Sequence, residues 1–218
     1  MSILRPRALL FDWDNTLVDT WETIHAAFNT TLTAMGQTPW TMDEARARIR
    51  ASARDSFPAM FGARADEAMD IFYRAFESQH LQTLRERDGA GAMLRTLAGM
   101  NPLYLAVVSN KKGHLLRREA AHIGWSDFFS RLVGANDAAR DKPAVEAVDL
   151  ALVDSGLRPG PDVWFVGDTD IDMTCAVAAN CTPVLLRPEA PAENEFPGAA
   201  PDLHVANCQA LLEVLRAL

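Results

Sequence analysis

The sequence predicts an α/β fold, with a parallel β-sheet core and one helical insertion. From about residue 100 onward, short apolar segments alternate with segments of helical periodicity. A similar apolar segment, residues 8–12, stands alone near the N-terminus, and the chain between it and residue 103 has an almost wholly helical pattern. The apolar segments are continuous rather than alternating, as expected when helices cover both faces of a parallel sheet.

The expected strands are apolar runs rich in β-branched and aromatic residues. After residues 8–12 they are LYLAVVSN (103–110), RLVGAND (131–137), VWFVGDT (163–169), TPVLLRP (182–188) and DLHVAN (202–207). The helices expected between them are HLLRREAAHIG (114–124), PAVEAVDLALVDSG (143–156) and IDMTCAVAAN (171–180). Pro143 suits a first helical turn, and Gly124 and Gly156 suit helix C-termini. These helices are expected to be right-handed crossovers between parallel strands.

The long helical segment predicts a second domain inserted after the first strand. Its helical patterns are ETIHAAFNTTLTAMG (22–36), MDEARARIRAS (42–52) and ADEAMDIFYRAFESQHLQTLRER (65–87), with AGAMLRTLAGM (90–100) leading back into the sheet. We therefore expect an α/β core made of residues 1–18 and 90–218, and a helical cap domain of residues 19–89 at one end of the sheet.

Composition narrows the classes of function. The 218 residues are 49% hydrophobic and 23% charged, as in an ordinary globular protein. A net charge of −8 disfavours nucleic-acid and anionic-membrane partners. The three cysteines lack CxxC spacing, and the five histidines form no HxxxH or HExxH pattern, so a zinc site or a disulfide framework is not expected. No apolar run has the length of a membrane span, and we expect a cytoplasmic protein.

Polar residues follow four of the expected elements, at the ends where open α/β sheets bind ligands. They are Asp12 and Asp14, Ser109 and Asn110, Lys142, and Asp168 and Asp172. Only two other lysines, Lys111 and Lys112, occur in the chain, which modestly favours a special role for Lys142.

These residue types suit Mg²⁺-dependent phosphoryl transfer. One of the paired carboxylates Asp12 and Asp14 can attack phosphorus while the other protonates the leaving oxygen, provided that the chain turns between them; Asn15 tolerates the left-handed backbone of such a turn. Mg²⁺ prefers carboxylate and carbonyl oxygens, so Asp12, the backbone at Asp14 and Asp168 are candidate ligands, with Asp172 supporting them. Lys142, Ser109 and Asn110 are candidate donors to the transferring group.

The same residues resemble the haloacid dehalogenase superfamily, in particular its phosphoglycolate phosphatase-like branch with a helical cap. The similarity extends over about residues 8 to 210, and four motifs occur in the family's order. They are DWDNT (12–16), SN (109–110), Lys142 before Pro143, and GDTDID (167–172). Two departures remove no functional group: Asn15 stands where many members have Gly, and KPAV lacks the second Pro often found after this lysine.

The resemblance implies a Rossmann-like core and hydrolysis of a small phosphomonoester through an aspartyl phosphate, with phosphoglycolate a possible substrate. It implies that Asp12 is the nucleophile and Asp14 the general acid and base. It also implies that Ser109 and Lys142 bind the phosphoryl group and that Asp12, the Asp14 carbonyl and Asp168 hold Mg²⁺. Dehalogenation is disfavoured, because the dehalogenases lack the second aspartate that Asp14 supplies.

The cap is expected to select the substrate, a small phosphorylated metabolite. ARDSFPAMFG (53–62) resembles the family's substrate-specificity loop, which makes Arg54 a candidate contact for an anionic leaving group. The ring of Trp13 is expected to pack near the cap. Two alternatives stay open. A β-phosphoglucomutase-like enzyme shares the four motifs, but the expected cap has no lysine, and His25 lies one position from the mutase histidine. A non-catalytic binding protein could also retain the fold.

Overall fold

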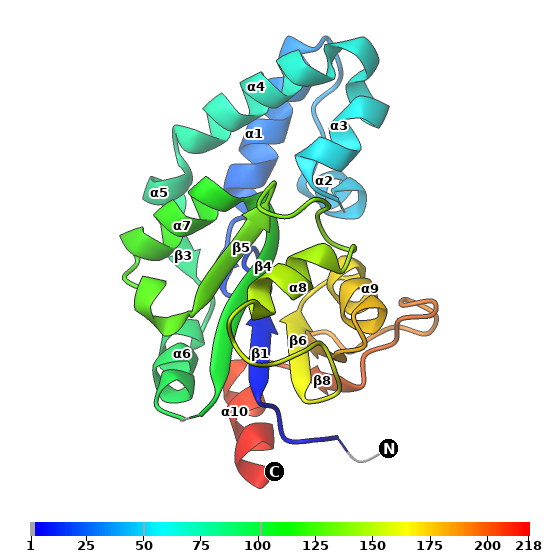
Figure 1. Cartoon of the computed structure of the whole chain (residues 1–218). Coiled ribbons are helices and arrows are strands. Elements are labelled where there is room, and N and C mark those ends of the chain that lie inside the picture. The colour runs from blue at the N-terminus through cyan, green and yellow to red at the C-terminus, as the bar shows by residue number, and fades with distance from the viewer. Residues whose placement is uncertain (1–2, 50, 101) are drawn as a thin grey trace. The chain divides into compact units, whose positions relative to one another are not determined.

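The computed structural model describes residues 3–49, 51–100 and 102–218, and it divides the chain into two compact units (Figure 1). Unit 1 consists of Met1–Val18 and Glu86–Leu218, and unit 2 of Asp19–Arg85. The chain passes between the units at two short paired strands, β2 (Val18–Asp19) and β3 (Arg85–Glu86). The sequence pattern did not reveal these strands, because two residues are too few to show a periodicity.

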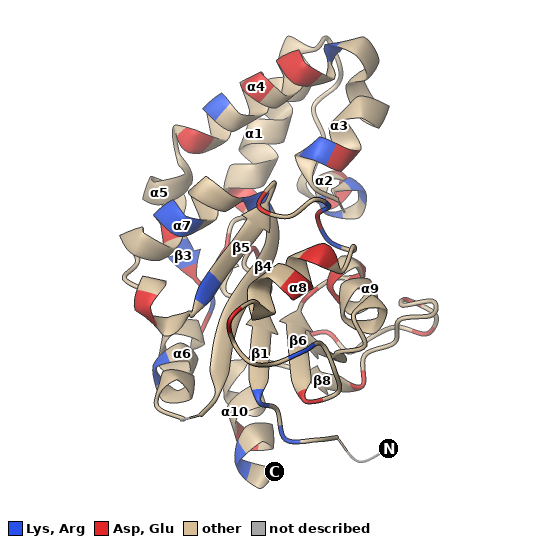
Figure 2. Ribbon diagram, in the orientation of Figure 1, with Lys and Arg blue, Asp and Glu red and all other residues tan. Residues whose placement is uncertain are grey.

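Unit 1 contains a six-stranded sheet with the order β5-β4-β1-β6-β7-β8, and its neighbouring strands are parallel. The strands are β1 (Ala8–Phe11), β4 (Tyr104–Lys112), β5 (Arg131–Ala135), β6 (Val163–Gly167), β7 (Thr182–Leu186) and β8 (Leu203–Val205). β1 and β6 carry no charged residue (Figure 2), in keeping with their central position. The predicted α/β class with a parallel sheet is confirmed.

Helices cover both faces of this sheet (Figure 1). Those of unit 1 are α6 (Ala90–Ala98), α7 (Gly113–His122), the short 3₁₀ helix η2 (Ser126–Phe128), α8 (Glu146–Leu152), α9 (Asp170–Ala178) and α10 (Cys208–Ala217). α8 and α9 pack on one face, where Ala8 and Leu10 point. The alternate residues Leu9 and Phe11 are equally buried against the other face, on the side of α6, α7 and α10.

Two helix ends show how local chemistry sets the boundaries. α7 ends at His122, and Gly124 follows with a φ of 72°, as predicted for a helix C-terminus. The helix expected to begin at Pro143 starts only at Glu146, so Pro143 lies in the turn before it. That turn carries Lys142 towards Asp12 instead of continuing the helix.

Unit 2 is helical, comprising α1 (Trp21–Ala34), α2 (Met42–Arg48), α3 (Ala53–Phe61), the 3₁₀ turn η1 (Gly62–Arg64), α4 (Ala65–Glu77) and α5 (His80–Thr83). Its core is aromatic, and the ring centroids of Phe28, Phe57 and Phe72 lie 4.9 to 5.6 Å apart. Acidic and basic residues both occur along the exposed side of α4 (Figure 2).

The expectation of a loop at residues 53–62 was wrong, because residues 53–61 form α3. Phe57 and Phe61 stand four residues apart, on one face of a helix, and both are buried in the aromatic core. Burial of these two rings fixes the segment as a helix. In the part of the chain that the structure describes, no helix is long and apolar enough to cross a membrane.

Candidate active site

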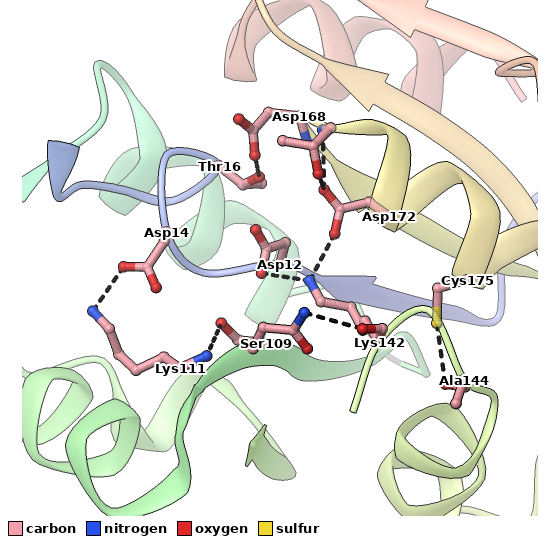
Figure 3. Close-up of polar contacts among 12 residues, drawn as sticks. Asp12, Asp14, Thr16, Ser109, Lys111, Lys142, Ala144, Asp168, Asp172 and Cys175 are labelled. Carbon is pink, nitrogen blue, oxygen red and sulfur yellow. Dashed lines mark hydrogen bonds and ion pairs between the residues drawn. The ribbon is translucent and has the colours of Figure 1, made fainter. Parts of the chain in front are cut away.

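The polar motifs of unit 1 meet at the carboxyl ends of β1, β4 and β6, which are neighbours in the sheet (Figure 3). Asp12 directly follows β1, and its amide still donates to the Val166 carbonyl of β6 at 2.8 Å. The chain then turns at Asn15, whose φ of 64° is the left-handed conformation expected from its residue type. The pairing of β4 with β5 shifts register between Val108 and Lys112, and this irregularity spans the Ser109 motif.

The first group of charged residues is the Lys142 cluster, which consists of Lys142, Asp12, Asp168 and Asp172. Lys142 Nζ donates to Asp12 Oδ1 at 2.7 Å and to Asp172 Oδ1 at 2.6 Å. The Lys142 side chain is 3% exposed, and those of Asp12 and Asp172 are 10% and 1% exposed. This ammonium therefore bridges a carboxylate that directly follows β1 and one that lies in α9.

Both oxygens of Asp172 are engaged within the cluster. Beyond the contact with Lys142, Oδ2 accepts from the amide of Asp168 at 3.2 Å and from the amide and hydroxyl of Thr169 at 3.0 and 2.8 Å. Gly167 has no side chain, and a Cβ there would clash with the Asp172 carboxylate. These contacts favour the supporting role predicted for Asp172. Asp168 Oδ1 accepts from the Thr16 hydroxyl at 2.9 Å.

The carboxylates of the Lys142 cluster suit a hard divalent cation. Asp12, Asp168 and Asp172 each offer an oxygen within 4.8 Å of the others. Burial, together with the charges of Asp172 and Asp14, raises the pKa of Asp12 to about 7 in spite of Lys142. Burial and the charges of Asp172 and Asp12 likewise raise the pKa of Asp168 well above its ordinary value. Negative charge is thus in excess here, and a divalent cation with oxygen ligands would relieve that excess.

The second group is the Lys111 cluster, which consists of Lys111, Asp14, Glu119 and Trp13. Lys111 Nζ lies 2.7 Å from Asp14 Oδ1 and 2.6 Å from Glu119 Oε2. Trp13 Nε1 donates to the same Glu119 oxygen at 2.7 Å. Burial lowers the pKa of Lys111, but the charges of Asp14 and Glu119 outweigh it and raise that pKa overall. Lys111 therefore stays protonated beside Asp14 and Glu119.

The structure brings seven of the eight predicted site residues together at this edge of the sheet. Ser109 Oγ accepts from the Lys111 amide at 3.2 Å, and Asn110 Nδ2 donates to the Lys142 carbonyl at 3.1 Å, which ties β4 to the Lys142 turn. Arg54, predicted to bind the leaving group, lies on α3 in unit 2.

The Trp13 ring packs against aromatic rings of unit 1. Its centroid lies 5.8 Å from that of Trp125 and 6.5 Å from that of Phe129, and these residues belong to unit 1 rather than to the insertion. The side chain is completely buried. An apolar ring between two strand-end aspartates is held inside the core, so Trp13 fixes the turn that presents Asp12 and Asp14.

Sequence reasoning missed Thr16, Lys111 and Glu119. One signal was available for Glu119: it lies within a turn of Leu115, Leu116 and Ala120, on the buried side of α7, where an acidic residue needs a partner. For Lys111, the only signal was a lysine that follows the apolar first half of a strand. Neither signal identifies the partner, because the two residues are joined only by the fold.

This parallel sheet carries a lysine-bridged aspartate cluster at the carboxyl ends of its central strands, where enzymes of the α/β class bind their ligands. A family model described as haloacid dehalogenase-like hydrolase matches residues 9–186. The chain belongs to this family.

Curated relatives carry related names. The chain is 30% identical over 178 residues to a phosphoglycolate phosphatase of Xylella fastidiosa, covering 80% of this chain and 77% of that protein. It is 32% identical over 146 residues to the pyrophosphatase PpaX of Listeria monocytogenes, covering 66% of each.

Solved structures show the same fold. A haloacid dehalogenase-like hydrolase of Streptococcus pneumoniae superposes with a TM-score of 0.83 at 20% identity, covering 96% of this chain and 98% of that one. A hydrolase of the same superfamily from Ehrlichia chaffeensis has a TM-score of 0.68 at 29% identity, covering 100% and 99%.

Proposed function

We propose that the protein is a Mg²⁺-dependent phosphatase that hydrolyses a small phosphomonoester through an aspartyl phosphate on Asp12. The observation that carries this proposal is the position of Asp12: it directly follows the central strand β1, accepts from Lys142 Nζ at 2.7 Å, and has the carboxylates of Asp168 and Asp172 beside it. A nucleophile, a fixed ammonium and a cation site meet there.

In the first step a carboxylate oxygen of Asp12 attacks phosphorus, and the bond from phosphorus to the ester oxygen breaks. Asp14 gives its proton to the leaving oxygen, which departs as an alcohol. In the second step Asp14 takes a proton from water as that water attacks phosphorus, and the bond to Asp12 breaks to release inorganic phosphate. Lys142 keeps Asp12 oriented, and with Ser109 it stabilises charge on the phosphoryl oxygens.

The oxygen-rich Lys142 cluster fits Mg²⁺, with Asp12, Asp168 and the Asp14 backbone as the proposed ligands and Asp172 as their support. When bound, Mg²⁺ supplies positive charge that neutralises the phosphoryl oxygens and orients them for in-line displacement. We also propose that unit 2 is the cap domain that selects the substrate, with Arg54 as a candidate contact for an anionic leaving group.

The names of the relatives define the substrate panel. One is a phosphoglycolate phosphatase and another a pyrophosphatase, so phosphoglycolate and pyrophosphate belong in the panel, with sugar phosphates and nucleoside monophosphates. We expect Mg²⁺-dependent phosphate release from at least one small anionic ester, and its loss in a folded Asp12→Asn variant. No release from the whole panel by the wild type would refute the proposal.

His25, the histidine nearest the position of the mutase histidine, gives no support to the alternative of a phosphomutase. His25 Nε2 lies 2.7 Å from the Trp40 carbonyl and 2.9 Å from Asn29 Nδ2, so its ring is engaged inside unit 2. The panel still separates the two activities, since a mutase would isomerise a hexose 1-phosphate with little phosphate release.

A further inference from the structure

We propose that Lys111 is the positioning residue for Asp14, and that Glu119 and Trp13 hold Lys111 in place for this task. The inference rests on the proposed function, because it concerns the proton transfers that Asp14 performs in it. None of the four family motifs includes Lys111 or Glu119, and the two residues become neighbours of Asp14 only through the fold.

The first step is the contact between Lys111 and Asp14. The ammonium lies 2.7 Å from Asp14 Oδ1, and the lysine side chain is 4% exposed, whereas that of Asp14 is 19% exposed. Asp14 is therefore reachable from solvent or substrate, while the group that holds it is not. Water does not compete strongly for a buried ammonium, so Lys111 holds one carboxylate oxygen of Asp14 in place. Holding that oxygen also restricts the direction in which the other oxygen points.

The second step is the support of Lys111 itself. Glu119 is completely buried, and its Oε2 accepts from both Lys111 Nζ at 2.6 Å and Trp13 Nε1 at 2.7 Å. Trp13 directly precedes Asp14 in the chain. The contacts from Asp14 to Lys111, Glu119 and Trp13 therefore form a closed circuit, which the backbone between Trp13 and Asp14 completes. Such a closed circuit of contacts resists rotation of the Asp14 carboxylate more than a single ion pair does.

The third step is the backbone beneath Lys111. The register shift between β4 and β5 includes Lys111, and Gly134 of β5 packs directly against the Lys111 carbonyl and Gly113. A Cβ at Gly134 would collide with this backbone, so the close approach requires glycine. The irregular segment is thereby held against β5, with the Lys111 side chain turned to Asp14.

A positioning role for Asp14 predicts a dependence on the leaving group. An alkyl alcohol is a poor leaving group and needs the proton that Asp14 provides, whereas p-nitrophenolate leaves readily without one. Displacing Asp14 should therefore slow cleavage of an alkyl phosphate far more than cleavage of p-nitrophenyl phosphate. A purely structural role of Lys111 would slow both alike.

The experiment measures kcat/KM for two substrates: p-nitrophenyl phosphate, and phosphoglycolate or the best alkyl ester of the panel. This quantity reports the steps up to departure of the alcohol. The variants are Lys111→Met, Glu119→Gln and Asp14→Asn, with Lys112→Met as the matched lysine control. Lys111→Met/Glu119→Leu removes both buried charges and remains testable if Lys111→Met does not fold. Lys111→Met/Asp14→Asn tests whether the two residues act as one unit.

We expect Lys111→Met to lower kcat/KM by roughly 10²-fold for the alkyl ester and by less than about 10-fold for p-nitrophenyl phosphate. Asp14→Asn should show the same asymmetry, the Lys111→Met/Asp14→Asn double variant should lose no more than Asp14→Asn, and Lys112→Met should match the wild type. Equal losses on both substrates, no loss, or additive losses in that double variant would overturn this inference but not the proposed function. A wild type inactive on every ester would instead overturn the proposed function and the inference with it.

Discussion

The two buried lysines of unit 1 make the same kind of contact in different surroundings. Lys142 and Lys111 each bridge two carboxylates, at 2.6 to 2.7 Å. The Lys142 cluster has a third carboxylate, Asp168, and burial raises the pKa of Asp168 and of Asp12. The Lys111 cluster instead ends in the apolar core, at Trp13 and the completely buried Glu119.

This difference shows how one interaction serves two purposes. The Lys142 cluster has more negative charge than its lysine can balance, so it is suited to take up a cation and an anionic substrate beside it. The Lys111 cluster has one carboxylate fewer and is closed by an indole donor, so it is suited to hold a side chain still. The carboxylates of the first cluster should therefore respond to metal, and the side chains of Lys111 and Glu119 should not.

Removing Lys142 should have the largest effect. Lys142→Met takes away the ammonium that orients Asp12 and faces the transferring group, so we expect kcat/KM to fall by about 10³-fold or more, as when a preorganised charge-stabilising donor is lost. The loss should extend to p-nitrophenyl phosphate, in contrast to Lys111→Met. Steady-state kinetics on a variant with a native circular dichroism spectrum checks this, and a loss below about 10-fold would contradict it.

Removing Glu119 should break the Lys111 cluster and destabilise the fold. Glu119→Ala leaves a buried ammonium with one carboxylate and an indole N–H without its acceptor, and the loss of one partner from a buried ion pair costs about 3 kcal/mol. Urea unfolding measures this change. The exposed pair Arg64–Glu67, with an Nε to Oε2 distance of 2.8 Å, provides the control, since Glu67→Ala should leave the unfolding midpoint almost unchanged.

Mg²⁺ should stabilise the wild type through the carboxylates of the Lys142 cluster and the Asp14 backbone, without a contribution from the side chains of Lys111 and Glu119. At a concentration of 100 times its Kd, a ligand that binds only the folded state adds about 2.7 kcal/mol, which corresponds to a rise in Tm of roughly 5 to 10 °C. The chelator EDTA should reverse the rise, and Asp168→Asn should abolish it. Glu119→Gln, which alters only the Lys111 cluster, should keep it. An equal loss in both variants would show that the two clusters are not independent.

The sequence predicted the Lys142 cluster better than the Lys111 cluster for a physical reason. Asp12 and Asp168 follow apolar strands directly, and parallel strands bring their carboxyl ends together whatever the details of packing. Glu119 meets Lys111 only because α7 packs beside β4. No spacing in the sequence indicates that these two residues are partners. The helix α3 was missed for a similar reason, since Phe57 packs against aromatic partners from α1 and α4.

The smallest effect is expected at an ion pair on α7, the helix that carries Glu119. Arg117 Nη1 and Nη2 donate to Asp137 Oδ2 and Oδ1 at 2.7 and 3.2 Å, and the arginine is 47% exposed. Burial raises the pKa of Asp137, but hydrogen bonds from Arg117 and the Gly134 amide outweigh it, so this pKa lies below its ordinary value of 3.8.

A group whose folded-state pKa is lowered stabilises the protein above its unfolded-state pKa, and that contribution disappears as the pH falls through the folded-state pKa. The difference in unfolding free energy between the wild type and Asp137→Asn should therefore be present near neutral pH, shrink in acid and weaken with added salt. Urea titrations across this pH range measure it, and a difference independent of pH would mean that Asp137 acts only through the shape of the turn.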